Sequence, residues 1–157
     1  MRADVVAATC RPVLADSQND TLLYTENAAP KAVNPTITVS DADFISDAHQ
    51  ENATVRIVSG MHAGDVLTYT ASSGSVYGSY GSFGNYAASA ADVTASFNAT
   101  SGVLLLTGAV SVSAWEAVLR AVTFSSSSED PTGTQSASDR TVSFVISDGD
   151  AGSSAVV

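Results

Sequence analysis

Residues 140 to 150 read Arg-Thr-Val-Ser-Phe-Val-Ile-Ser-Asp-Gly-Asp, and this stretch carries the pattern that decides the fold. Val142, Phe144 and Ile146 alternate with other residues, which places all three on one face of a β-strand. The Asp-Gly-Asp sequence that follows is rich in turn-forming residues. Short alternating runs separated by small polar turns recur along the whole chain, and this is typical of half-buried strands.

The same alternation predicts strands through most of the sequence. They are expected near residues 22–26, 36–39, 53–58, 66–71, 93–97, 103–107, 122–125 and 140–147. Residues 103 to 106 read Val-Leu-Leu-Leu, so this strand should be central in its sheet or covered on both faces.

One segment changes from strand to helix periodicity. Apolar residues occur at helical spacing at positions 112, 115, 118, 119 and 122, and Ser113 followed by Glu116 has the form of a capping box. A short crossover helix is therefore predicted near residues 112–121, with Trp115 and Leu119 closing one end of the core. Together these patterns predict an all-β Greek-key β-sandwich with one short helix.

The length of 157 residues suits one domain. We expect an N-terminal arm at residues 1–21 and a sandwich domain at residues 22–157, with a Gly/Ser/Tyr-rich insertion at residues 72–91. Residues 4–15 are expected to pack as an edge strand, on this sandwich or on a neighbouring copy. Cys10 is the single cysteine, so no disulfide can form within the chain.

Composition limits the partners of the protein. Sixteen acidic residues against six basic ones give a net charge of −10, which repels nucleic acid and anionic lipid. No run approaches the ~20 apolar residues of a membrane span, so membrane insertion is not expected. Charged residues make up only 14% of the chain, and a Ser/Thr/Ala/Val/Gly-rich composition is typical of β-rich secreted and surface proteins. N-glycosylation sequons occur at Asn19, Asn52 and Asn98.

The sequence offers little for catalysis. His49 and His62 are the only histidines; His49 falls in a polar loop and His62 in a turn. The chain contains no nucleophile elbow, phosphate loop or dinucleotide fingerprint. We therefore predict that the protein is not an enzyme.

The insertion carries evenly spaced aromatic residues, Tyr77, Tyr80, Phe83 and Tyr86, with Gly and Ser between them. Such a composition is typical of binding loops, which combine rigid aromatic contact area with small adaptable neighbours. These side chains could stack on sugars or dock a neighbouring subunit. The alternative is an extended hairpin whose aromatic rings cover their own sandwich.

The order of several segments resembles one bacterial cadherin-like tandem repeat, of the type found in giant surface adhesins. Two of the matching pieces are Ser-Asp-Ala-Asp at residues 40–43 and Ile-Ser-Asp-Gly-Asp at residues 146–150. The other matching pieces are residues 25–27, 37–39, 53–57, 64–67, 95–108, 115–124 and 140–145. The resemblance covers most of residues 22–150, and it implies an immunoglobulin/cadherin-like sandwich used as one bead of an extracellular string.

The resemblance also implies bound calcium near the ends of the bead. Carried over by position, the ligands are Glu26, Asp41, Asp43, Asp148 and Asp150. Calcium takes six to eight oxygen ligands, which carboxylates from separate loops can supply together. The alternative is that these residues simply favour turns, because their side chains bond nearby backbone N–H groups.

Taken together, the sequence predicts an extracellular or cell-surface module with a structural or adhesive role. It would be one bead of a surface adhesin or filament, stiffened by calcium, with neighbouring copies or repeats as its partners. The alternative prediction is a carbohydrate-binding module that uses the aromatic insertion to hold polysaccharide.

Overall fold

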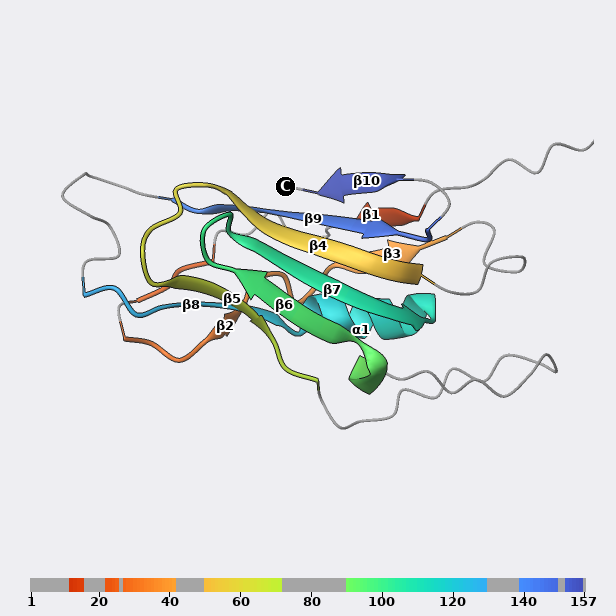
Figure 1. The fold of residues 1–157 in the computed structure, drawn as a ribbon, viewed down its shortest axis with the longest axis horizontal. Helices are drawn as coiled ribbons and strands as arrows, with labels where there is room; N and C mark the ends of the chain where they lie inside the picture. The colour runs from red at the N-terminus through yellow and green to blue at the C-terminus, as the bar shows by residue number, and fades with distance from the viewer. Residues whose placement is uncertain are drawn as a thin grey trace, which may run out of the picture.

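The computed structural model describes residues 12–15, 22–25, 27–41, 50–71, 90–129, 139–149 and 152–156. Within these residues the chain forms antiparallel β-sheets and one α-helix (Figure 1). The prediction of an all-β sandwich with a single short helix is therefore confirmed.

The larger sheet has five strands in the order β10-β9-β4-β7-β6. They are β4 (Gln50–Ser59), β6 (Thr94–Asn98), β7 (Val103–Val110), β9 (Thr141–Ser147) and β10 (Gly152–Val156). The longest of them, β4, pairs antiparallel with β9 on one side and with β7 on the other. It is therefore the centre of this layer.

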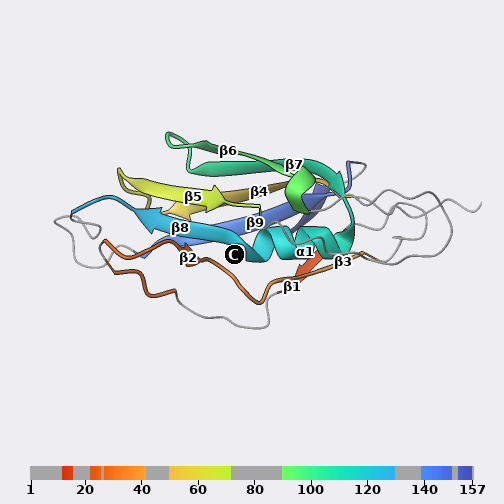
Figure 2. The same ribbon diagram turned by 90° about the horizontal axis from the view of Figure 1, so that it is seen from below.

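The opposite side of the sandwich is built from shorter pieces. A three-stranded sheet has the order β2-β8-β5, formed by Lys31–Ala32, Val122–Ser126 and Asp65–Tyr69. Beside it β1 (Val13–Ala15) pairs with β3 (Thr38–Ser40). Figure 2 shows β8, β2 and the helix α1 (Val112–Arg120) on one side of the molecule and β6 and β7 on the other.

Strand alternation builds the core between these layers. Val55 of β4 is aligned with Leu104 of β7 and with Phe144 of β9, and all three side chains are buried. Phe144 and Ile146 face the interior, as their alternation predicted. Leu105 is 45% exposed, so β7 is a central strand that is covered on one face only.

The helix lies where helical spacing predicted it, but its cap is different. Ser111, not Ser113, is the N-cap, and its hydroxyl accepts a hydrogen bond from the Ala114 N–H. The predicted capping box is therefore wrong, because Glu116 is used elsewhere. Trp115 and Leu119 are fully buried, which confirms their predicted place in the core. No helix in the described ranges is long and apolar enough to cross a membrane.

The strand predicted at residues 22–26 is wrong over residues 22–25, which are irregular, and residue 26 lies outside the described part. This segment is held by side chains instead of a ladder. The Tyr24 ring packs edge-on against Phe124 with centroids 5.1 Å apart, and its hydroxyl donates to the Ala28 carbonyl. Lys31 Nζ donates to the Leu23 carbonyl, which takes an acceptor that a ladder would need.

The short strands β2 and β10 were not predicted, whereas an edge strand was expected in the region of β1. Residues 13–15 form β1 on this sandwich's own β3, with Leu14 aligned to Val39 and buried. They are part of the segment predicted as an edge strand, whose residues 4–11 lie outside the described residues. The strand β2 has only two residues, and β10 reads Gly-Ser-Ser-Ala-Val without apolar alternation, so neither stands out in the sequence.

Candidate functional site

The structure describes two of the predicted calcium ligands, Asp41 and Asp148. The other predicted site residues lie outside the described ranges: Glu26, Asp43, Asp150, Tyr77, Tyr80, Phe83 and Tyr86. The surroundings of Asp41 and Asp148 are therefore the part of the predicted calcium site that the structure describes.

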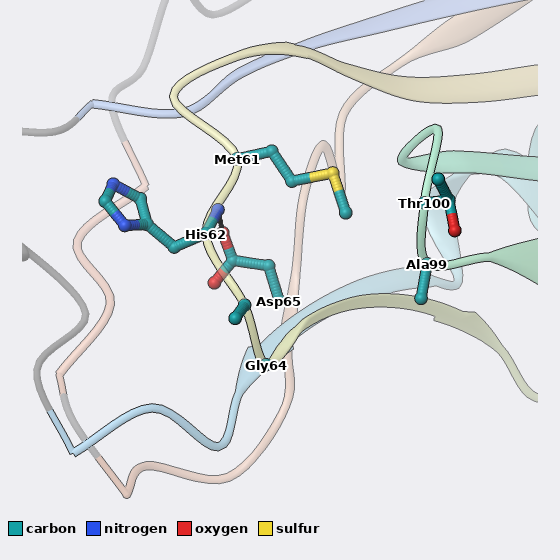
Figure 3. Close-up of a pocket in the computed structure, with 7 residues that line it drawn as sticks. Met61, His62, Gly64, Asp65, Ala99 and Thr100 are labelled. Atoms are coloured by element: carbon teal, nitrogen blue, oxygen red, sulfur yellow. Dashed lines mark hydrogen bonds between the residues drawn. The ribbon is translucent and has the colours of Figure 1, made fainter.

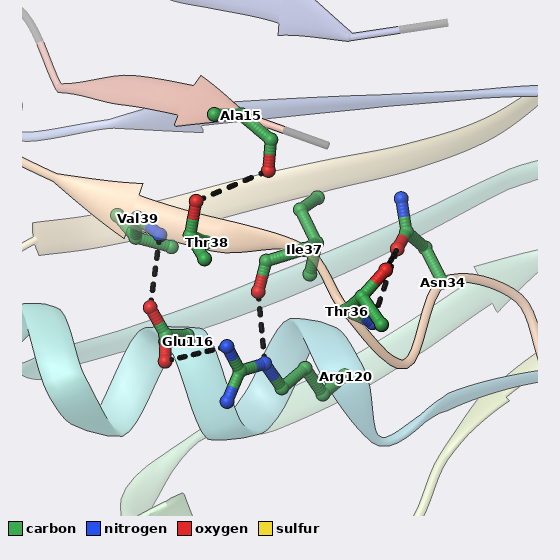
Figure 4. A network of polar contacts seen from close by, with 8 residues as sticks. All are labelled: Ala15, Asn34, Thr36, Ile37, Thr38, Val39, Glu116 and Arg120. Atoms are coloured by element: carbon green, nitrogen blue, oxygen red, sulfur yellow. Dashed lines mark hydrogen bonds and ion pairs between the residues drawn. The ribbon is translucent and has the colours of Figure 1, made fainter. Parts of the chain in front are cut away.

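Asp41 follows β3, and β3 is fixed from both sides. One edge pairs with β1, and the other edge faces α1 (Figure 4). Glu116 of the helix accepts the Val39 N–H at 3.2 Å, and Arg120 Nε donates to the Ile37 carbonyl at 2.8 Å. A 2.8 Å ion pair joins Glu116 to Arg120. Two helix side chains thus satisfy backbone groups that a neighbouring strand would otherwise bond.

Asp41 is tied to the first residue of β4. Its Oδ2 accepts a 2.7 Å hydrogen bond from Gln50 Nε2, and Gln50 is completely buried. The Gln50 backbone carbonyl in turn accepts a 2.7 Å hydrogen bond from the indole N–H of Trp115. The end of β3, the start of β4 and the helix are therefore connected through one glutamine.

Asp148 reaches the same end of the sandwich from β9. Ser147, the last residue of β9, is aligned with Asn52 near the start of β4, and Asp148 is only 7% exposed. The next residue, Gly149, has φ +93°, and a Cβ added there would lie 2.6 Å from the carboxylate of Glu51. Asp41, Gln50, Glu51 and Asp148 thus share one end of the molecule, which we name the acidic pole.

Sequence reasoning missed Gln50 and Glu51 as members of this pole. Counting back by twos from Ala53 puts Glu51 inside and Gln50 outside. The structure does the reverse, because the register of β4 against β7 shifts between Gln50 and Asn52. A β-bulge of this type turns a side chain to the other face. The sequence carries no signal for this exchange, because the shift depends on pairing with the distant strand β7.

The pole has donors that suit a hard cation. Carboxylate and amide oxygens are the ligands that calcium prefers. Gln50 Oε1 is buried and has no hydrogen-bond partner, so an acceptor beside Asp41 is left unsatisfied. In the described part of the chain no three His, Cys, Asp or Glu side chains converge as a metal group would. Asp41 and Gln50 thus offer oxygens of the type that calcium binds, and Asp148 lies at the same end of the sandwich.

The opposite pole contains a compensated acid. Asp65, the first residue of β5, has a fully buried side chain that accepts from Arg140 Nε at 2.9 Å and from Nη2 at 3.2 Å. The same carboxylate accepts the His62 N–H at 2.8 Å. The Arg140 guanidinium lies 6.0 Å from the centre of the Phe124 ring. This acid has its cation within the fold.

An open hollow lies at the same end, between the turn before β5 and the turn that joins β6 to β7 (Figure 3). Met61, His62, Asp65 and Thr100 contribute to its lining. The His62 ring points away from Ala99 and Thr100 in Figure 3. Asp65 is already bonded to Arg140 and to the His62 backbone. In this arrangement the Asp65 carboxylate stabilises the fold through its bonds to Arg140 and His62.

A third polar feature connects the strand before the predicted insertion with the end of that insertion. The Tyr69 hydroxyl, at the end of β5, donates a 2.6 Å hydrogen bond to the Ala90 carbonyl. Both residues are buried, and burial raises the pKa of Tyr69 above its ordinary value of 10.0. The residues that flank positions 72–89 are therefore held close together by the core.

No protein-family model matches the chain, and neither a curated protein nor a solved structure matches it.

Proposed function

We propose that the chain is an extracellular structural or adhesive module, one bead of a surface adhesin or filament, with calcium bound at the acidic pole. One observation carries the proposal. Asp41 and Asp148, which are far apart in the sequence, are brought to the same end of the sandwich by β3, β4 and β9. Turns of a sandwich cluster at two ends, and these ends are where successive beads of a string meet.

The charge distribution supports the calcium part of the proposal. A chain with a net charge of −10 that places carboxylates at one end pays an electrostatic cost there. Two such charges repel by about 1 to 4 kcal/mol per close pair, depending on the local screening. A bound divalent cation would convert this repulsion into attraction and would stiffen the joint between beads.

The layer structure supports the structural role. The ladder between β4 and β9 has aligned residues from Asn52 with Ser147 to Ser59 with Thr141, and β10 continues the sheet beyond β9. Asp65, which lines the described hollow, forms an ion pair with Arg140. The ion pair thus helps to fix the fold, as a structural bead requires.

The test combines a calcium response with an assembly measurement. Excess chelator should lower the melting temperature of the whole chain, restored calcium should raise it, and Asp41→Asn with Asp43→Asn should remove most of the response. Glu129→Gln is the matched control, because Glu129 is an exposed acid beyond β8, near the opposite pole. Self-association is followed by light scattering and electron microscopy. A particle that stays monomeric at all concentrations, with a melt insensitive to chelator, would contradict the proposal.

A carbohydrate-binding role is the second candidate, favoured by the hydrogen bond from Tyr69 to Ala90. A binding loop gains affinity when its ends are fixed by a rigid scaffold, since less freedom is lost on binding. Tyr80→Ala with Phe83→Ala should then abolish retention on a polysaccharide panel without a change in melting temperature. If the wild type binds no glycan, this candidate is rejected and the structural module remains.

A further inference from the structure

We propose that the side-chain carbonyl of Gln50 is a direct ligand of the cation at the acidic pole, beside Asp41. The class of cation is a hard divalent ion with oxygen ligands, for which calcium is the probe. This inference deepens the calcium part of the proposed function and rests on it. It assigns a neutral residue that lies on a strand, away from the acidic turns.

The side-chain oxygen of Gln50 is buried and unsatisfied. Gln50 is 0% exposed, and its Oε1 accepts no hydrogen bond. Buried polar groups are almost always bonded in folded proteins, because an unmade bond leaves the full desolvation cost. An orphan acceptor at the start of the central strand therefore indicates a partner that the described part of the chain does not supply.

The unsatisfied oxygen also lies beside the Asp41 carboxylate. Gln50 Nε2 donates to Asp41 Oδ2 at 2.7 Å, and Oε1 is bonded to the same carbon as Nε2. The amide carbonyl therefore lies next to the Asp41 carboxylate. Exchanging the amide nitrogen and oxygen gives no relief, because two acceptor oxygens would then face each other. A cation beside the pair satisfies the Gln50 oxygen, contacts the Asp41 carboxylate as well and keeps the hydrogen bond.

The described basic side chains that form bonds are engaged elsewhere in the fold. Arg2 and Arg11 lie outside the described ranges, and the remaining four are Lys31, Arg56, Arg120 and Arg140. Lys31 bonds the Leu23 carbonyl, Arg120 pairs with Glu116, and Arg140 pairs with Asp65 at the other pole. Arg56 is exposed in the middle part of β4. The bonds of these side chains therefore lie away from Gln50.

Gln50 is also held rigidly in place. Gln50 is aligned with Val110 of β7, and its backbone carbonyl accepts the Trp115 indole N–H at 2.7 Å. Trp115 is itself fully buried. A metal ligand held by packing and by hydrogen bonds behind it loses little freedom when the ion binds. Trp115 thus acts as a positioning residue for Gln50.

The contact with Trp115 supplies a spectroscopic test. Trp115 is the single tryptophan of the chain. Tb³⁺ takes oxygen ligands as calcium does, and an indole close by sensitises its luminescence when tryptophan is excited selectively. We expect the intact chain to give Trp-sensitised Tb³⁺ emission that added Ca²⁺ displaces. Gln50→Leu should weaken Tb³⁺ and Ca²⁺ binding by about 10- to 100-fold, the range for loss of a group that supports a metal site.

Two further variants keep the test decisive. Gln50→Glu retains an oxygen and adds charge, so it should bind Ca²⁺ at least as tightly as the wild type even if the leucine variant folds poorly. Glu129→Gln should bind like the wild type, and tryptophan emission in the absence of Tb³⁺ checks the fold of each protein. Unchanged affinity in a folded Gln50→Leu protein, or weaker binding in a folded Gln50→Glu protein, overturns the inference.

The outcomes separate this inference from the proposed function. If Asp41→Asn weakens calcium binding and Gln50→Leu does not, the calcium-bound bead stands and Gln50 is not a ligand. If chelator lowers the melting temperature but no Trp-sensitised emission is seen, the cation lies away from Trp115 and the inference fails alone. If calcium has no effect but the chain still assembles, the inference fails and the structural role remains.

Discussion

The two ends of the sandwich handle buried charge in opposite ways. At one end Asp65 is fully buried and is bonded to Arg140 by two hydrogen bonds. At the acidic pole Asp41 is bonded to a neutral amide, whose own oxygen has no partner. One end therefore balances its acid with a cation of the chain, whereas the other places acids at the same end as an unsatisfied acceptor.

This difference indicates at which end of the sandwich an external cation can bind. A buried acid that is already paired gains little from a metal ion, since the ion would have to displace Arg140. The acidic pole has the reverse property, because an ion there would meet the Gln50 side-chain oxygen, which the fold has placed but not satisfied. Conditions that remove cations should therefore act on the acidic pole and leave the Asp65 end unchanged.

The largest expected effect comes from removing Arg140. Arg140→Met leaves the Asp65 carboxylate buried without its partner, which should lower the free energy of unfolding by about 3 to 5 kcal/mol. Urea denaturation measures this loss, and it should be the same with and without calcium. Asp65→Asn combined with Arg140→Met should be clearly less destabilised, because no buried charge remains. A loss below about 1 kcal/mol would show that the pair behaves as a surface ion pair.

Two glycines compare the poles directly. Gly60 and Gly149 both have positive φ, +71° and +93°. Gly149→Ala should cost about 1 to 2 kcal/mol from backbone strain, since the Glu51 side chain it meets can move away. Gly60→Ala should cost at least about 1 kcal/mol more, because its Cβ would lie 2.1 Å from the Asp139 backbone oxygen. Equal losses in thermal melts would contradict this ranking.

The smallest effect concerns Tyr69 at the other end of β5 from Asp65. Tyr69→Phe removes the hydrogen bond to Ala90 and should cost about 1 kcal/mol near neutral pH. Burial raises the Tyr69 pKa in the folded state above 10.0, so the protonated form is favoured by folding. Its contribution is complete below the unfolded pKa and is lost as pH rises through the folded pKa. Melts above pH 10 should therefore decline less steeply for Tyr69→Phe, and an unchanged slope would contradict the assignment.

The sequence by itself determined the class of fold and much of the core. Alternation placed Phe144 and Ile146 inside, and helical spacing placed Trp115 and Leu119 inside, because these patterns depend only on the geometry of one strand or one helix. The antiparallel all-β architecture followed from the same local periods. Local patterning failed at residues 22–25, where Tyr24 and Lys31 hold the chain through side-chain bonds instead of a ladder.

Only the tertiary structure decided the acidic pole. The sequence proposed Asp41 and Asp148 as partners through resemblance, but it gave no reason to include Gln50 or Glu51. The register shift in β4 exchanged the faces of these two residues, and that shift arises from pairing with β7, which lies more than forty positions further along the chain. Register and hydrogen-bond satisfaction are properties of pairs of distant segments. A polar atom is therefore recognisable as unsatisfied only when every neighbour around it is known.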